Sequence, residues 1–239
     1  VWSLKYYART AAVSLNTDYA TFEGIQTKLT ASGGYPSVMS VNASATNALV
    51  HVRSNIIAAD FSGMTGANYG LGISASGKTV YMYNNIIYDI ISSSGGGSIA
   101  IRNNSGESYI YNNTFYNCAI GVRGSSTAPY FEVRSNIFDS CGAGTSSYVD
   151  LATNNITNNA ALQFRDETGY DFHLAATDAV ARDTGTDYSQ SLTLSFVSDI
   201  DGGTRPYGAL WDIGADEYGA QDLTKIYRSV APGLTDPVV

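Results

Sequence analysis

Residues 80–87 read VYMYNNII, and three further versions of this phrase occur in the chain: VHVRSNII (50–57), SYIYNNTF (108–115) and FEVRSNIF (131–138). A fifth, shorter version, NNIT, spans residues 154–157. The second Asn of the phrase recurs at positions 55, 85, 113, 136 and 155, which are 30, 28, 23 and 19 residues apart. A fixed phrase with an irregular period is typical of stacked coils that differ in the length of their loops.

The residues on either side of this Asn alternate as they do in a half-buried strand. We expect three rows of side chains to point inward: Val50/Val80/Ser108/Phe131, Val52/Met82/Ile110/Val133 and Ile57/Ile87/Phe115/Phe138. The residues between the first two rows should point outward, and they form the rows His51/Tyr81/Tyr109/Glu132 and Arg53/Tyr83/Tyr111/Arg134.

A second strand precedes each phrase and carries an apolar-x-apolar signature, at Met39/Val41, Leu71/Ile73, Ile99/Ile101 and Ile120/Val122. Its second apolar residue lies 14, 12, 12 and 14 residues before the repeated Asn. Coils of this size cannot bury an apolar face alone, and stacking them about 4.8 Å apart aligns like residues. The pattern predicts an all-β right-handed parallel β-helix, a single-stranded solenoid, with a β-sandwich as the alternative.

The repeated Asn residues, at positions 55, 85, 113 and 136, are expected to form a column at one corner of the coils. Asn tolerates a left-handed backbone, and its side-chain amide can hydrogen-bond to the same residue in the next coil. Gly would accept the backbone conformation but could not form such a column of amides. The column is therefore a structural feature and carries no chemistry.

Beyond residue 160 the repeat stops and four phrases follow in order: DFHL (171–174), ARDTG (181–185), DIDGGTR (199–205) and DIGADEY (212–218). This part of the chain resembles the C-terminal end of right-handed parallel β-helix proteins of the pectate-lyase-like superfamily, and the resemblance covers roughly residues 18–220. Such domains occur in bacterial exported proteins and in bacteriophage virion proteins. The resemblance implies the fold and leaves the activity open, because a fold alone does not license a function.

Three regions follow from this organisation. Residues 1–160 should form the β-helix coils, with further coils of the parent protein expected before residue 1. Residues 161–220 should form the last coil and a C-terminal cap in which Trp211, Ile213 and Tyr218 cover that coil and Arg205 pairs with Asp212. Residues 221–239 are expected to be an extended arm or a linker.

Composition narrows the function. The 239 residues include 13 basic and 21 acidic side chains, a net charge of −8, which disfavours nucleic acid as a partner. No apolar run approaches the roughly 18 residues that a membrane-spanning helix needs, so no membrane insertion is expected. Charged residues make up only 14% of the chain, a composition common in extracellular β-proteins. We therefore expect the protein outside the cell or on a virion surface.

The residue patterns of known chemistry are missing from the sequence. There is no adjacent Asp-Asp pair of the kind that β-helix galacturonases use, and His51 and His173 are the only histidines. Asp199-x-Asp201-Gly202 looks like the start of a calcium loop, but position twelve of that loop would be Leu210 and not Glu. No catalytic residue, cofactor or metal site is predicted, with Asp199 and Asp201 as the candidates if calcium were bound.

The two outward rows predict a surface patch made of His51, Arg53, Tyr81, Tyr83, Tyr109, Tyr111, Glu132 and Arg134. Such a patch can stack sugar rings, bury against another subunit, or be an ordinary strand surface rich in Tyr. The expected function is a non-catalytic structural or adhesion module with protein neighbours, such as a decoration or tail-associated protein of a phage particle. The alternative is a β-helix protein that binds or, like a lyase, degrades polysaccharide.

Cys118 and Cys141 each lie five residues after a repeated Asn, so they should occupy one column in adjacent coils. Ile90 takes the same place one coil earlier, which indicates a buried position. We expect two free thiols, since stacked side chains point the same way and strain an S–S bond, with a disulfide as the alternative. A buried thiol has a raised pKa, and neither Cys is expected to be catalytic.

Overall fold

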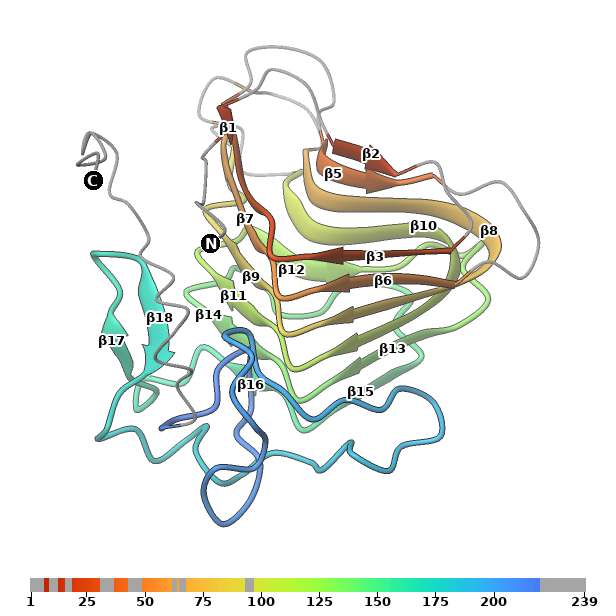
Figure 1. Cartoon of the computed structure of the whole chain (residues 1–239). Coiled ribbons are helices and arrows are strands. Elements are labelled where there is room, and N and C mark those ends of the chain that lie inside the picture. The colour runs from red at the N-terminus through yellow and green to blue at the C-terminus, as the bar shows by residue number, and fades with distance from the viewer. Residues whose placement is uncertain are drawn as a thin grey trace, which may run out of the picture.

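The computed structural model describes residues 7–8, 13–15, 19–30, 37–42, 49–61, 64, 68–92 and 97–219. The expected arm at 221–239 and the expected coils before residue 1 lie outside this range. The described residues form strands, turns and irregular segments, with no helix among them and hence none that could cross a membrane. The protein is all-β and is built on two large parallel sheets (Figure 1).

The first sheet has seven strands, all parallel, in the order β1-β4-β7-β9-β11-β14-β16. Each strand pairs with the strand that holds the same place in the next copy of the repeat. Thus Ile56 lies beside Ile86, Ile86 beside Thr114, and Thr114 beside Ile137. The bounds are Tyr7–Ala8, Gln26–Thr30, Ile56–Asp60, Ile86–Tyr88, Thr114–Tyr116, Ile137–Asp139 and Ile156–Thr157.

The second sheet has nine strands: β2 (Val13–Leu15), β3 (Tyr19–Glu23), β5 (Ser37–Val41), β6 (Leu49–Arg53), β8 (Tyr69–Tyr83), β10 (Ile99–Tyr111), β12 (Ile120–Arg123), β13 (Phe131–Arg134) and β15 (Leu151–Thr153). The strands β8 and β10 are long and curve around a corner (Figure 1). Their first halves pair with β5 and β12, and their second halves pair with β6 and β13. The sheet therefore consists of two columns of strands, one on either side of the corner.

The core between these columns is made of the rows expected from the repeat. Val52, Met82, Ile110 and Val133 lie side by side on β6, β8, β10 and β13 and have no exposed surface. The row Ile57, Ile87, Phe115 and Phe138 is equally buried, and the rings of Phe115 and Phe138 stack 4.7 Å apart. The predicted inward rows and their register are confirmed.

The repeated Asn residues form a ladder at one corner, buried except for its half-buried last member Asn155, which we call the asparagine ladder: Asn55, Asn85, Asn113, Asn136 and Asn155. Each Nδ2 donates to the Oδ1 of the next Asn, over 3.0, 2.9, 3.0 and 3.0 Å. The same Oδ1 atoms accept a backbone N–H from the preceding Asn of the ladder. The stacked column is thus present as expected.

The left-handed backbone at this corner belongs to a different residue from the one predicted. The residue before each ladder Asn has φ between 48° and 55°: Ser54, Asn84, Asn112, Ser135 and Asn154. The ladder residues themselves are not among the positive-φ residues. The ladder Asn is therefore selected for its amide alone, and the turn is made by its small or polar neighbour.

After β16 the chain leaves the stack. Strands β17 (Phe164–Asp166) and β18 (Asp171–Leu174) form an antiparallel pair, and residues 175–219 are irregular. The sequence predicts that this part covers the last coil. Instead Phe172, Leu174 and Ile213 pack beside Tyr88 and Ile137 of the seven-stranded sheet. The C-terminal part therefore lies along the outer side of several layers, since its apolar residues match the apolar outward face of that sheet.

The C-terminal part also binds the corner that holds the asparagine ladder. The side chain of Asn84 donates to the Ser198 carbonyl over 2.6 Å, and that of Asn112 donates to the carbonyls of Asp212 and Gly214. These are left-handed corner residues, so their side chains are directed out of the stack. The corner is thus the place where the C-terminal part is attached.

The predicted pair of Arg205 and Asp212 is wrong in its acidic partner. The guanidinium of Arg205 is buried and pairs with Glu217 over 3.1 Å. At Asp212 it donates a hydrogen bond to the backbone carbonyl and not to the carboxylate. The Asp212 carboxylate accepts the N–H groups of Asp183 and Tyr218 instead. Because backbone N–H groups already occupy the Asp212 carboxylate, Arg205 forms its ion pair with Glu217 instead.

Cys118 and Cys141 are both buried and both free. They lie in adjacent layers, because the N–H of Gly142 donates to the Cys118 carbonyl over 3.0 Å. Burial raises the pKa of the Cys118 thiol, as does the neighbouring Cys141. The two thiols are part of the core.

Candidate functional site

The two predicted outward rows do lie side by side on β6, β8, β10 and β13. His51 is in register with Tyr81, Tyr81 with Tyr109, and Tyr109 with Glu132. The second row, Arg53, Tyr83, Tyr111 and Arg134, follows two residues further along the same strands. The eight side chains are thus gathered on one sheet face as the repeat predicts.

About half of this predicted surface patch is buried. Tyr83 and Tyr111 are only 4% and 2% exposed, because the C-terminal part lays an aromatic cluster over them. The ring of Phe196 lies 4.8 Å from Tyr83, and the ring of Tyr188 lies 4.8 Å from Tyr111. Trp211 is a further buried member of this cluster. The expectation that Tyr83 and Tyr111 face a ligand or a subunit is therefore wrong: their partner is the chain itself.

Glu132 is also withdrawn from solvent, at 5% exposure. Its carboxylate accepts the hydroxyls of Tyr111 and Tyr130 over 2.5 and 2.7 Å and pairs with Arg134. Burial and the bond to Glu132 raise the pKa of Tyr111 far above its usual range. This network anchors the covered half of the patch.

The other half remains open. The rings of His51 and Tyr81 lie 5.1 Å apart, and those of Tyr81 and Tyr109 lie 5.2 Å apart, all three half-buried. Burial and the charge of Arg53 lower the pKa of His51, so this imidazole is neutral at pH 7. Arg53 itself pairs with Glu23 over 2.8 Å at the edge of the row. The open half is therefore an aromatic strip with little free charge.

A cavity of about 500 Å³ lies next to this strip and is lined by Tyr19, Leu49, Gly77, Lys78, Thr79, Glu107 and Pro129. Four of these residues, Tyr19, Leu49, Thr79 and Glu107, form one row across β3, β6, β8 and β10. That row precedes the His51/Tyr81/Tyr109 row by two residues, so the two rows adjoin on one face. We call the rows Tyr19/Leu49/Thr79/Glu107 and His51/Tyr81/Tyr109 together the tyrosine groove.

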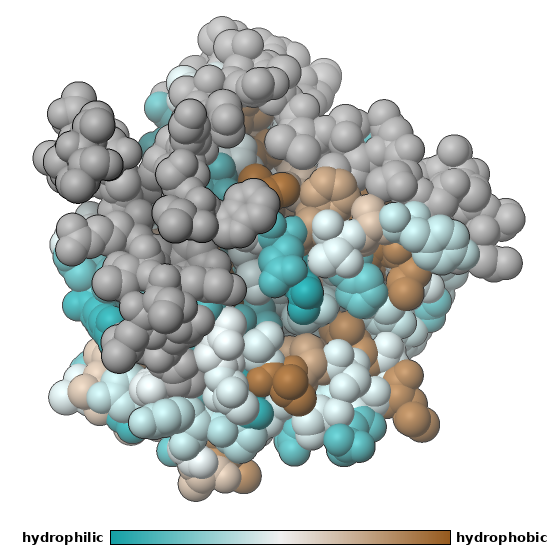
Figure 2. Space-filling model, in the orientation of Figure 1, coloured by the Kyte–Doolittle hydropathy of each residue, from teal (hydrophilic) through white to brown (hydrophobic). Residues whose placement is uncertain are grey.

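Polar groups of the groove are held in fixed positions. Glu107 accepts the hydroxyls of Tyr109 and Thr79 over 2.5 and 3.2 Å. Lys78 is buried beside them, and its ammonium has no hydrogen-bond partner among the described residues. Figure 2 shows the described side chains in this view as small hydrophobic spots separated by polar ones, without one continuous apolar face. The groove thus combines aromatic rings with a few oriented polar atoms.

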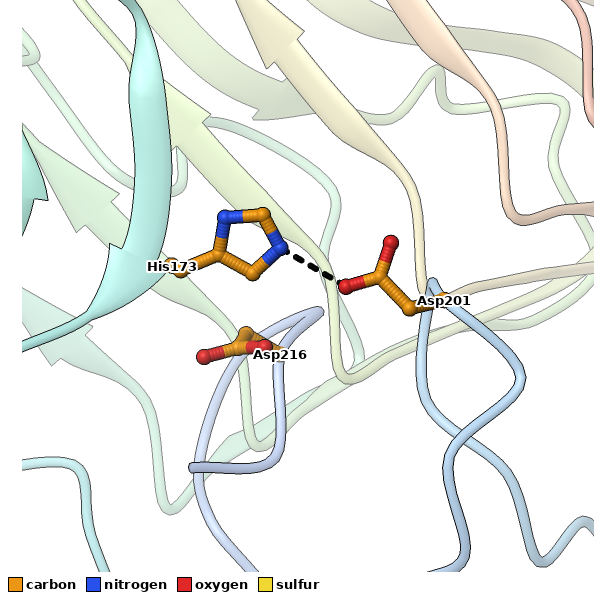
Figure 3. Close-up of side chains that lie close together, drawn as sticks. All are labelled: His173, Asp201 and Asp216. Atoms are coloured by element: carbon orange, nitrogen blue, oxygen red, sulfur yellow. Dashed lines mark hydrogen bonds and ion pairs between the residues drawn. The ribbon is translucent and has the colours of Figure 1, made fainter. Parts of the chain in front are cut away.

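A second cluster, absent from the predicted site residues as a group, lies in the C-terminal part (Figure 3). The atoms that His173, Asp201 and Asp216 can offer to a ligand all lie within 4.8 Å of one another. Nε2 of His173 contacts Oδ2 of Asp201 over 2.7 Å, and Nδ1 contacts the Asp171 carboxylate. Asp216 is buried and accepts the N–H of Leu174 through Oδ2 over 2.7 Å.

The charges of this cluster are strongly coupled. Burial acts to lower the pKa of His173, but the carboxylates of Asp171, Asp201 and Asp216 outweigh it and raise the pKa to about 10. Burial raises the pKa of Asp199 to about 7, against the pull of Arg205 and with the help of Asp216 and Asp201. At neutral pH the protonated ring of His173 therefore bridges the carboxylates of Asp171 and Asp201.

The candidates for calcium, Asp199 and Asp201, do not point to a common centre. Asp199 accepts the N–H groups of Asp201 and Gly203 through Oδ1 and that of Glu217 through Oδ2. Its oxygens therefore shape the turn, and only Asp201 reaches His173. The loop of Asp199 is a hydrogen-bonded turn.

No family model, no curated protein and no solved structure matches the chain.

The sequence did contain a signal for the second cluster. His173 belongs to DFHL, Asp201 to DIDGGTR and Asp216 to DIGADEY, three of the four phrases that carry the family resemblance. The cavity of the tyrosine groove had no such signal, because Pro129 lies in an irregular segment and Lys78 in the middle of β8, whose curved course the repeat does not specify.

Proposed function

We propose that this chain is a right-handed parallel β-helix of the pectate-lyase-like kind that acts as a non-catalytic adhesion module outside the cell or on a phage particle, and that it binds carbohydrate in the tyrosine groove. The β-helix is supported by three columns of parallel strands, by the asparagine ladder and by the four C-terminal phrases. Neighbouring proteins of that surface or particle would contact faces outside the groove.

The observation that carries the carbohydrate proposal is the cavity that adjoins the row of Tyr81 and Tyr109, two residues before it along the same strands. Tyr offers a flat apolar ring with a polar tip, which suits sugars that have an apolar face and a polar rim. Binding sites for small molecules are concave, mostly apolar and have a few placed polar groups, here Glu107 and Thr79. A subunit interface would need a larger, flatter patch, and the C-terminal part already occupies half of it.

The state of the two glutamates supports binding without catalysis. A glycosidase needs one carboxyl group as acid and another as base or nucleophile, about 5 to 10 Å apart across the scissile bond. Glu132 is buried under three partners, and Glu107 already accepts two hydroxyls. Both carboxylates therefore act as orienting acceptors for tyrosines and a threonine.

The test is a glycan array followed by calorimetry with the best ligand. Tyr81→Ala and Tyr109→Ala should each weaken binding about tenfold or more, which corresponds to about 1.4 kcal/mol per tenfold. Tyr148→Ala is the matched control, since that side chain is 59% exposed and lies outside the groove. Absence of any glycan ligand, or equal binding by the Tyr81→Ala, Tyr109→Ala double variant, would overturn the proposal. Release of new chain ends from any bound polysaccharide would overturn its non-catalytic part.

A further inference from the structure

The C-terminal part brings a histidine and two aspartates from three separate segments to one point (Figure 3). His173 comes from β18, Asp201 from the turn that follows Ile200, and Asp216 from the last described segment. We propose that His173, Asp201 and Asp216 form a binding site for one divalent transition-metal ion, zinc or manganese, which ties these three segments together. This site is independent of the tyrosine groove.

The geometry needs little adjustment. Zinc binds histidine nitrogen and carboxylate oxygen at about 2.0–2.2 Å, so ligand atoms around one ion lie roughly 3–4 Å from one another. The three donor atoms already lie within 4.8 Å of one another. The side chains are largely shielded, with exposed fractions of 18% for His173 and 7% for Asp201. Nε2 of His173 and Oδ2 of Asp201 lie 2.7 Å apart, closer than two ligand atoms of one ion, so the Asp201 carboxylate would move away from the ring to admit the ion.

Hydrogen bonds from other residues orient the proposed ligands in the way that is usual in metal sites. A metal-bound histidine generally donates its other ring N–H to a carboxylate or carbonyl, which fixes the ring and its tautomer. Asp171 fills this place at Nδ1 of His173 and leaves Nε2 directed toward Asp201 and Asp216. Asp216 is oriented in turn by the N–H of Leu174. These contacts come from residues other than the three proposed ligands, and they indicate Nε2 of His173 as the ligand atom.

Charge and donor type select the ion. Three carboxylates, those of Asp171, Asp201 and Asp216, lie around the ring of His173, and a divalent cation would compensate their charge. One imidazole nitrogen with carboxylate oxygens suits zinc or manganese, whereas calcium and magnesium prefer oxygen ligands alone. The ion would replace the proton that His173 and Asp201 share, because a ligating imidazole must be neutral.

The experiment uses the full chain, freed of metal with a chelator and then dialysed, in calorimetric titrations with zinc and manganese chloride. We expect one ion per chain and a higher melting temperature. Asp201→Asn and Asp216→Asn should each weaken binding at least tenfold, whereas Asp187→Asn, an exposed aspartate of the same region, should not. Near-ultraviolet circular dichroism establishes that the variants are folded.

A second measurement needs no variant. The chain has only two histidines, so zinc should shift the ring resonances of His173 in an NMR spectrum and leave those of His51 unchanged. Absence of saturable binding, an unshifted His173, equal binding by folded Asp201→Asn and Asp216→Asn variants, or equal affinity for calcium would each overturn the proposal. The glycan tests of the tyrosine groove are unaffected by any of these outcomes.

Discussion

A single ladder residue shows how much one side chain can contribute to this fold. Nδ2 of Asn113 donates to the carbonyls of Met82 and Tyr111 and to Oδ1 of Asn136, and its own Oδ1 accepts from Asn85. All of these groups are buried, and water cannot replace a missing partner. Only an amide has both the donor and the acceptor that this position requires.

Replacing Asn113 by Leu should therefore destabilise the protein by about 1–3 kcal/mol, the range for one unsatisfied buried polar group. Asn155→Leu at the end of the ladder should cost less, because that residue is half-buried and makes fewer bonds. Urea titration of both variants measures the difference. An Asn113→Leu variant as stable as Asn155→Leu would contradict the ladder's role.

His173 gives the residue-scale prediction for pH. In the metal-free protein its pKa is raised from 6.5 to about 10, so the folded state binds this proton more tightly than the unfolded state does. The resulting stability is fully present below pH 6.5 and is lost as the pH rises toward 10. In the presence of a chelator, the melting temperature should fall between pH 7 and 10. His173→Gln should be less stable at pH 7 and should lose most of this slope; a slope that persists unchanged in the variant would show that another group causes it.

At the scale of strands, the sequence predicts what repeats. The rows of Val52 and Ile57 were predictable because each layer repeats the same alternation, so one register explains all copies. The continuous path of β8 around its corner was not, since the repeated phrase and the apolar-x-apolar signature before it indicate two separate strands. The cover over Tyr83 was not predictable either, because a Tyr on a strand suits a wet surface and a buried one equally well, and Phe196 lies more than one hundred residues away.

The attachment of the C-terminal part to the corner depends on Gly214, which has φ +99°. A Cβ on this residue would lie 2.5 Å from Cδ1 of Ile137 and 3.0 Å from Oγ1 of Thr114. Gly214→Ala should therefore destabilise the protein by more than the roughly 1–2 kcal/mol that a left-handed backbone alone costs. Gly24→Ala is the control, because Gly24 also has a positive φ but nothing lies within 4 Å of its added Cβ. Equal melting temperatures for the two variants would mean that the corner tolerates the clash.

At the scale of the whole molecule, two sheets and an outer segment depend on one another. The aromatic cluster of Tyr83, Tyr111, Tyr188, Phe196 and Trp211 joins the second sheet to the C-terminal part. Phe196→Ala should lower the free energy of unfolding by about 3 kcal/mol, at the low end of the range for buried aromatics because the cluster is near the surface. Glycan binding in the tyrosine groove should be kept. A variant that loses glycan binding while it remains folded would show that the covered and open halves of the face act together.

The outer segment also has a mechanical consequence. Through Ser198 it holds the layer of Asn84, and through residues 212–215 it holds the layer of Asn112 and Thr114 and the following layer, that of Ser135. In a plain stack each layer contacts only its neighbours, so a pulling force can peel the end layer away on its own. Here the three layers of Asn84, Asn112 and Ser135 cannot separate from one another before these cross-links break. Under a pulling force these three layers would therefore separate from the rest of the molecule as one block and not one at a time.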